Sequence, residues 1–169
     1  DEVEKNSDGR IAVELYPNSS LGSERVMFEA CQMGTLEVAY GTTSVLANFD
    51  KNMQVLDLPF LFADAESARA AVNGDLGAAA DANLGDIGLI NLAYMENGIR
   101  HVTNSVKPIN TPDDLKGLKI RTMENSIHMS SFEHLGASPT PMAFTELFTA
   151  LQQKTVDAEE NPIFLIQTS

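Results

Sequence analysis

Two arginines in this sequence stand where a guanidinium group could hold a carboxylate. Arg121 follows the short apolar segment 118–120, and Arg100 follows the longer apolar segment 88–98. A guanidinium keeps its charge at any biological pH, and its planar fork can form two parallel hydrogen bonds with a carboxylate. Ligands of open α/β sheets bind beyond the carboxyl ends of the strands, where these two arginines could meet. Position alone leaves a second interpretation open, in which each arginine forms an exposed ion pair.

Residues that usually carry catalysis or bind metal ions form no familiar pattern in this sequence. There is no G-x-S-x-G, H-E-x-x-H or glycine-rich phosphate-binding motif. His128 and His134 lie six positions apart on one expected helix, so they are not stacked as paired metal ligands would be, and we expect both to be solvated or half-buried. Glu159 and Glu160 are adjacent on an expected strand and would point to opposite faces, one packed and one solvated. The sequence therefore predicts no catalytic residue, no metal site and no cofactor.

The composition narrows the classes of partner. The 169 residues carry 24 acidic and 11 basic side chains, a formal net charge of −13, which argues against binding to nucleic acid. No apolar run reaches the length of about 18 residues that spans a bilayer, so no direct insertion into a membrane is expected. Cys31 is the one cysteine, which excludes an internal disulfide, and we expect it to be buried in a helix without a role.

Short strands and helices alternate through the first 97 residues. Strands are predicted over 10–17, 35–41, 55–62 and 88–98 from their apolar periodicity and bounding prolines and glycines. Helices are predicted to begin at the N-caps Ser23 and Asp64 and to end at Gly34 and Asn73, and an alanine-rich helix follows over 76–85. This alternation predicts an α/β fold.

The same alternation continues after residue 97. A capped helical turn is predicted from Thr111, a strand over 118–122 and a helix over 125–136. The next helix places Phe144, Leu147, Phe148 and Leu151 on one apolar stripe that would face a core. Because the first and last segments read as interrupted elements, we expect a fragment with a partial first lobe, residues 1–97, and a partial second lobe, residues 98–169.

Four blocks of the sequence resemble the extracytoplasmic solute-binding subunits of TRAP transporters, the dicarboxylate-binding DctP family. They are "YPNSSLGSE", "VLDLPFLF", "ENGIRHVTNSVKPINTPDDLKGLKIRTMEN" and "LGASPTPMAFTELFTALQQKTVDAEENP". The resemblance implies a two-lobed periplasmic fold, each lobe a sheet flanked by helices, whose lobes close on a small organic acid about a hinge near residues 97–100. The acid could be a plain, hydroxy or sugar acid. The protein would pass it to the membrane subunits of the transporter and would not be an enzyme, although no export signal is present in this chain.

The resemblance also implies roles for particular residues. Arg121 would anchor the carboxylate, and the side-chain amide of Asn161 would donate to the same group. Glu124 lies three residues after Arg121, so it would either accept hydrogen bonds from ligand hydroxyls or pair with Arg121. The further implied site residues are Arg100 as a second cation, Phe144 as an aromatic surface for the ligand, and Gly41, Thr42 and Thr43 as pocket lining from the first lobe. Phe144 also belongs to the apolar stripe and could simply be core.

Two other functions fit parts of the sequence. An α/β enzyme could bind a substrate carboxylate with Arg100 and Arg121 and use Glu124 as a base. A ligand-sensing effector domain could use the same two-lobed fold and would be fused to a DNA-binding or signalling segment. The enzyme predicts turnover of the ligand, whereas the binding protein predicts its recovery unaltered.

Overall fold

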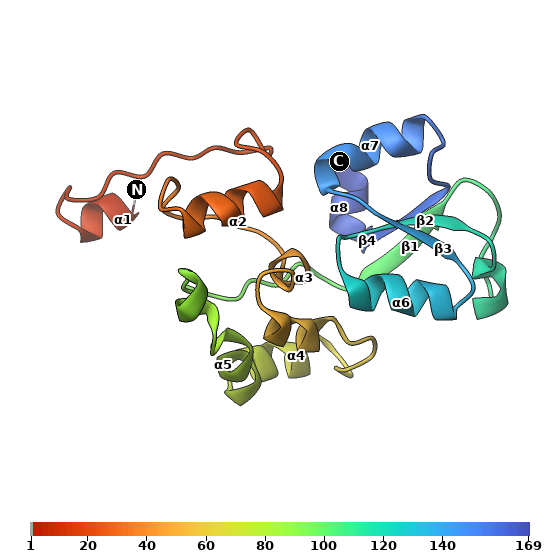
Figure 1. Ribbon diagram of the computed structural model, residues 1–169, viewed down its shortest axis with the longest axis horizontal. Helices are drawn as coiled ribbons and strands as arrows, with labels where there is room; N and C mark the ends of the chain where they lie inside the picture. Colours follow the sequence, from red (N-terminus) through yellow and green to blue (C-terminus); the bar gives the residue numbers. More distant parts are fainter. Residues whose placement is uncertain (1) are drawn as a thin grey trace.

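The computed structural model describes residues 2–169, and its one sheet lies in the C-terminal part of the chain, residues 100–169 (Figure 1). Its strands are β1 (Arg100–Asn104), β2 (Lys119–Thr122), β3 (Ser138–Pro141) and β4 (Ala158–Pro162). The strand order is β1-β4-β2-β3. β2 runs parallel to both β3 and β4, and β1 pairs antiparallel with β4. The α/β fold class is therefore confirmed.

Helices cover both faces of this sheet. α6 (Ser126–His134) connects β2 to β3, and α7 (Phe144–Gln152) connects β3 back to β4. Because these crossovers run in opposite directions across the sheet, the right-handed rule places their helices on opposite faces, as Figure 1 shows. The short helices η3 (Pro112–Leu115) and α8 (Ile163–Thr168) precede β2 and follow β4. Ile120 and Ala158 are fully buried at the centre of this core.

The N-terminal part, residues 2–99, is helical. Its elements are α1 (Glu2–Asn6), α2 (Glu24–Gln32), α3 (Thr43–Leu46), η1 (Lys51–Asp57), α4 (Ala65–Val72), α5 (Asp75–Asp81) and η2 (Leu84–Ile87). Ser23 and Asp64 cap α2 and α4 as predicted, because each side chain accepts a hydrogen bond from a backbone N–H of its first turn. Met53 and Ala80 are the most deeply buried residues of a second, smaller apolar core.

The four strands predicted before residue 99 do not form among the described residues. Residues 51–57 wind into η1, which takes up the start of the segment expected over 55–62, and segments 10–17, 35–41 and 88–98 are without regular structure. An extended segment becomes a strand only when a neighbour satisfies its backbone groups, and no such neighbour lies beside these segments in the described part of the chain. Their apolar side chains are exposed, notably Ile11, Leu15, Val38, Tyr40, Ile90 and Leu92.

Two smaller expectations are also corrected. The apolar stripe of α7 is only partly covered, because Leu147 is buried but Phe148 is 68% exposed. Cys31 is half-buried and not enclosed in a core. No helix within residues 2–169 combines the length and apolar character required to cross a membrane.

Candidate functional site

Arg121 on β2 is almost fully buried, with 1% of its surface exposed. Its Nε and Nη2 atoms donate hydrogen bonds to the backbone carbonyl of Met142, at 3.1 and 2.8 Å. Its Nη1 atom is equally buried but has no hydrogen-bond partner among the described residues. The sheet and the Met142 carbonyl thus fix the orientation of the guanidinium and leave one of its donor nitrogens unused.

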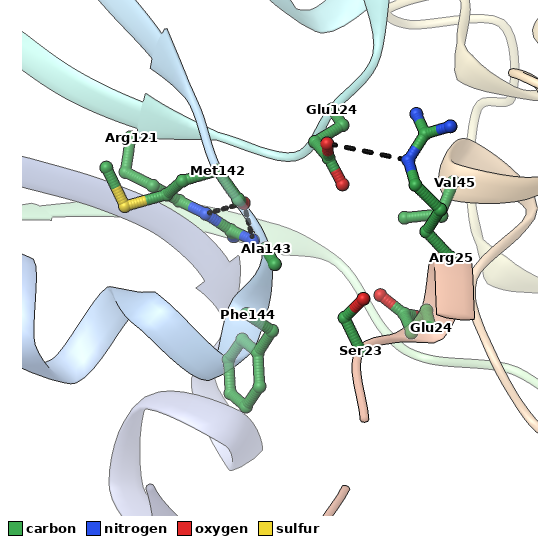
Figure 2. Close-up of a pocket in the computed structure, with 9 residues that line it drawn as sticks. All are labelled: Ser23, Glu24, Arg25, Val45, Arg121, Glu124, Met142, Ala143 and Phe144. Atoms are coloured by element: carbon green, nitrogen blue, oxygen red, sulfur yellow. Dashed lines mark hydrogen bonds and ion pairs between the residues drawn. The ribbon is translucent and has the colours of Figure 1, made fainter. Parts of the chain in front are cut away.

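Arg121 lines a small pocket between the two parts of the chain (Figure 2). From the C-terminal part, Phe144 lies beside it, with 6.0 Å between Cζ of Arg121 and the ring centroid. The pocket holds about 220 Å³ of open space, including solvent at its mouth. The full lining is Ser23, Glu24, Arg25, Val45, Arg121, Glu124, Met142, Ala143 and Phe144.

The electrostatics of Arg121 suit an anion. Burial has the largest effect and lowers the pKa of Arg121 below its ordinary value, and the neighbouring Arg100 adds to this, whereas the carboxylates of Glu160, Glu24 and Glu159 oppose it. The side chain stays charged near neutral pH, because arginine is not deprotonated in proteins. A buried cation with an unused donor can gain a charge-assisted hydrogen bond from a carboxylate that enters the pocket.

Two carboxylates line the pocket together with this cation. Glu124 pairs with Arg25, at 3.7 Å between Oε1 and Nε, and not with Arg121. Glu24 lies in the first turn of α2, and its Oε1 accepts a 2.6 Å hydrogen bond from the backbone N–H of Thr42. An ionised carboxylate can only accept hydrogen bonds, so the two glutamates suit the hydroxyl groups of a ligand.

Three residues of the N-terminal part that were predicted to line the pocket, Gly41, Thr42 and Thr43, are not among the residues that line it. Thr42 caps α3 with its side chain, and Thr43 is the first residue of that helix. Gly41 packs so closely on Phe28 that an added Cβ would lie 2.6 Å from the ring atom Cζ. Residues 41–43 therefore contribute to the pocket indirectly, because the backbone N–H of Thr42 holds the side chain of Glu24.

Arg100 and Asn161 also lie outside the pocket lining, and they are already hydrogen-bonded to other residues. The guanidinium of Arg100 forms a two-pronged contact with the carboxylate of Glu160, and its Nη2 donates to Oδ1 of Asn161 at 3.0 Å. The amide of Asn161 donates to Glu159 at 2.7 Å. The expectation that one of Glu159 and Glu160 is solvated was wrong, because both are buried at about 5% exposure or less.

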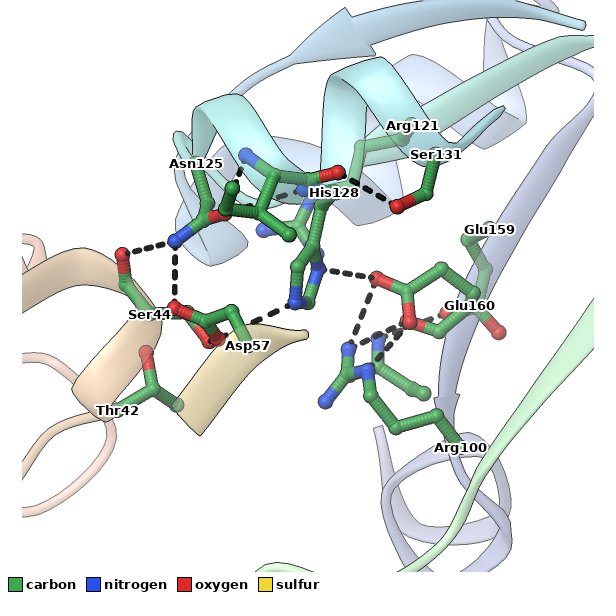
Figure 3. A network of polar contacts seen from close by, with 12 residues as sticks. Thr42, Ser44, Asp57, Arg100, Arg121, Asn125, His128, Ser131, Glu159 and Glu160 are labelled. Atoms are coloured by element: carbon green, nitrogen blue, oxygen red, sulfur yellow. Dashed lines mark hydrogen bonds and ion pairs between the residues drawn. The ribbon is translucent and has the colours of Figure 1, made fainter. Parts of the chain in front are cut away.

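Polar contacts join the two parts of the chain next to this site (Figure 3). The side-chain amide of Asn125, the N-cap of α6, donates to the carbonyl of Ser44 at 2.9 Å and to Asp57 at 2.8 Å. His128, one turn further along α6, lies between Asp57 and Glu160. Within the described residues, no group of three or more His, Cys, Asp or Glu side chains could hold a metal ion.

Sequence reasoning missed several of these residues. Glu24 showed only the signal of a helix start, and the backbone carbonyl of Met142 leaves no side-chain signal. Asp57 and Glu160 are separated from His128 by 71 and 32 positions, so nothing local pointed to their contact.

A profile of the bacterial extracellular solute-binding proteins, family 7, matches residues 1–169. A solute-binding protein of Verminephrobacter eiseniae is 46% identical over 165 residues, which cover 98% of this chain and 49% of that protein. The 2,3-diketo-L-gulonate-binding periplasmic protein of Escherichia coli is 39% identical over 166 residues, 98% of this chain and 51% of that protein. The chain thus spans about half the length of these curated relatives.

Solved structures of periplasmic and sugar acid-binding proteins also match this chain over about half of their own length. A TRAP periplasmic solute-binding protein from Polaromonas sp. JS666, bound to D-erythronate, matches 99% of this chain and 55% of its own, with 48% identity and a TM-score of 0.95. The sugar acid-binding protein DctPAm from Advenella mimigardefordensis, in complex with galactonate, matches 98% of this chain and 54% of its own, with 42% identity and a TM-score of 0.95.

Proposed function

Because this chain belongs to family 7 of the bacterial extracellular solute-binding proteins, we propose that the protein containing it captures a small hydroxylated carboxylic acid. The observation that carries this proposal is the buried Nη1 of Arg121, which has no partner among the described residues at the pocket between the two parts of the chain. The acid's carboxylate would take that donor, and Phe144 would pack on the carbon chain next to it.

The two pocket glutamates support the choice of a hydroxylated acid. Glu24 and Glu124 would accept hydrogen bonds from ligand hydroxyls, whereas a second ligand carboxylate would be repelled by them. The relatives from Polaromonas and Advenella hold sugar acids, which combine one carboxylate with several hydroxyls. A sugar acid is therefore the ligand class that we propose for this protein.

We further propose that residues 1–97 and 98–169 are parts of two lobes that close on the ligand. Gly98 lies at the junction with φ +117°, and an added Cβ would meet Pro162 at 3.2 Å, so glycine suits this position. Direct contact of the ligand with Arg100 or Asn161 stays a prediction. It would require these side chains to exchange bonds that they now make to Glu160 and Glu159.

The relatives also support a proposal for the cellular location of the protein and for its membrane partner. Its relative in Escherichia coli is a periplasmic protein, and the Polaromonas relative is a TRAP periplasmic solute-binding protein. We propose that the protein works in the periplasm and delivers its ligand to the membrane subunits of a TRAP transporter.

Thermal unfolding of the full-length protein that contains this chain tests the ligand class. D-erythronate, D-galactonate, D-galacturonate and succinate are compared at one common concentration, and a ligand that is present at a hundredfold excess over its Kd stabilises the folded state by about 2.7 kcal/mol. We expect stabilisation by sugar acids and little by succinate. Ligand recovered unaltered after incubation excludes turnover, whereas conversion of the acid would favour the enzyme.

Arg121→Lys tests the anchor. Lysine keeps the charge but loses the fork, so we expect calorimetry to show weaker sugar-acid binding by about 1.5–3 kcal/mol. Arg69→Lys is the matched control, because Arg69 lies on α4 in an exposed pair with Glu96. This variant should bind the sugar acid as tightly as the parent. Equal affinity in Arg121→Lys and the parent would contradict the anchor.

A further inference from the structure

His128 lies between two buried carboxylates that come from different parts of the chain (Figure 3). Its Nε2 is 3.3 Å from Oδ1 of Asp57, at the end of η1, and its Nδ1 is 3.7 Å from Oε1 of Glu160, on β4. The imidazole is 12% exposed, and the carboxylates are exposed by 4% and 5%. His128 therefore connects the N-terminal part of the chain to the centre of the sheet.

The geometry determines the charge of this histidine. A neutral imidazole has one donor nitrogen and one acceptor nitrogen, and an ionised carboxylate can only accept. Since both ring nitrogens face carboxylate oxygens, the ring satisfies both contacts only when both nitrogens carry protons. Burial alone would lower the pKa of His128, but Asp57 and Glu160 outweigh it and raise the pKa from 6.5 to about 9.

The contact continues from Glu160 into the sheet. Burial would raise the pKa of Glu160, but the neighbouring side chains of His128 and Arg100 outweigh it and lower that pKa. Arg100, on β1, binds the same carboxylate from its other side and donates to Asn161. Arg121, on β2, adds positive charge near Glu160. The contacts therefore run from Asp57 through His128 and Glu160 to Arg100 and Asn161.

We propose that protonated His128 is a positioning residue that latches the N-terminal part to β4 and thereby fixes Glu160, Arg100 and Asn161 beside the anion pocket. Loss of its proton at alkaline pH would leave one ring nitrogen facing a carboxylate without a hydrogen, so the latch would open. Only the last step, the effect on ligand binding, rests on the proposed function.

The titration of His128 tests the latch without any ligand. In the full-length protein, we expect the NMR signal of its ring carbon Cε1 to titrate near pH 9, and Asp57→Asn to move that midpoint toward 6.5. A midpoint at or below 6.5 in the folded parent would overturn the proposal. If Asp57→Asn does not fold, the parent titration and His128→Gln decide the question.

The pH profile of stability separates a charged latch from simple packing. Because the pKa of His128 is raised on folding, its charge stabilises the protein fully below pH 6.5, and this stabilisation is lost as the pH rises to about 9. We therefore expect the difference in Tm between the parent and His128→Gln to shrink over this interval. His134→Gln, on the exposed face of α6, is the matched control and should follow the parent. A constant difference between the parent and His128→Gln would overturn the latch.

Ligand binding provides the final comparison. With D-erythronate as the probe, we expect His128→Gln to bind about tenfold more weakly than the parent below pH 7, and the two to converge above pH 9. Equal affinity of the two proteins below pH 7 would overturn the positioning role. If no sugar acid binds the parent, the proposed function fails while the titration still decides the latch.

Discussion

Arg100 and Arg121 both lie on strands of the sheet, but they differ in what surrounds their guanidinium groups. Arg100 meets a carboxylate, Glu160, which neutralises it and occupies its fork. The hydrogen bonds of Arg121 go to one backbone carbonyl, and its Nη1 keeps no partner among the described residues. The first arrangement holds a structure together, whereas the second leaves a buried charge that a ligand can neutralise.

This contrast predicts opposite effects on stability. Arg100→Gln would leave the buried Glu160 with one cationic partner fewer, and we expect a loss of about 3 kcal/mol in the free energy of unfolding. Arg121→Gln removes a desolvated cation that has no hydrogen bond to a carboxylate, so stability should stay within about 1 kcal/mol of the parent, while sugar-acid binding is lost. Urea unfolding and calorimetry of both variants check this. A larger loss of stability in Arg121→Gln than in Arg100→Gln would contradict it.

Among the elements, α6 has two roles at its first turn. The Oδ1 atom of Asn125 accepts hydrogen bonds from the backbone N–H groups of Ile127 and His128, at 2.9 and 3.1 Å. Its amide nitrogen donates to Ser44 and Asp57 in the N-terminal part. One side chain therefore starts the helix and ties it to the rest of the chain, and the same turn presents His128 to its two carboxylates.

Substitution of this cap should cost more than substitution of an ordinary cap. We expect Asn125→Ala to lose about 2–4 kcal/mol, because a helix cap contributes about 1 kcal/mol and buried polar partners left unsatisfied add about 1–3 kcal/mol. Ser23→Ala, which removes a cap of α2 with one long hydrogen bond, is the control and should lose about 1 kcal/mol or less. Chemical denaturation measures both losses in the free energy of unfolding. If Asn125→Ala loses no more than Ser23→Ala, the amide contacts of Asn125 contribute little.

Helices were more predictable than strands because their signals are local. Ser23 and Asp64 were predicted as helix starts from residues close by in the sequence, and each caps its helix in the structure. A strand depends on partners far along the chain, so the segment 10–17 has the composition of a strand but no ladder. The site residues divide in the same way. Arg121 could be predicted from its place at the end of an apolar segment. Its hydrogen bond to the Met142 carbonyl and the contacts of His128 join distant residues, so they could not be predicted from the sequence.

At the scale of the whole molecule, the two parts of the chain differ in how much of their apolar surface is buried. The C-terminal part has a sheet with helices on both faces (Figure 1). The N-terminal part exposes apolar side chains along its extended segments. Phe60 is fully exposed, and Leu15 and Ile90 are each 81% exposed. An extended segment with unpaired backbone groups and exposed apolar side chains is a surface on which another segment can pack.

We therefore expect residues 1–169, produced alone, to bind the dye ANS more strongly than the full-length protein. Leu15→Ser and Ile90→Ser should lower dye binding by residues 1–169 with little change in its stability, because these side chains already face solvent. The same substitutions should lower the Tm of the full-length protein if its remaining segments cover them. Equal dye binding by the long and short chains would show that these surfaces stay exposed.

The bond between Arg121 and the Met142 carbonyl has a consequence for the thermodynamics of capture. An arginine free to rotate has about 2 kcal/mol of side-chain entropy to lose. Here two nitrogens of the guanidinium are already held, at 3.1 and 2.8 Å from the carbonyl oxygen, so most of that entropy is lost when the chain folds. A ligand then meets a rigid donor, and its affinity is not reduced by the ordering of that side chain.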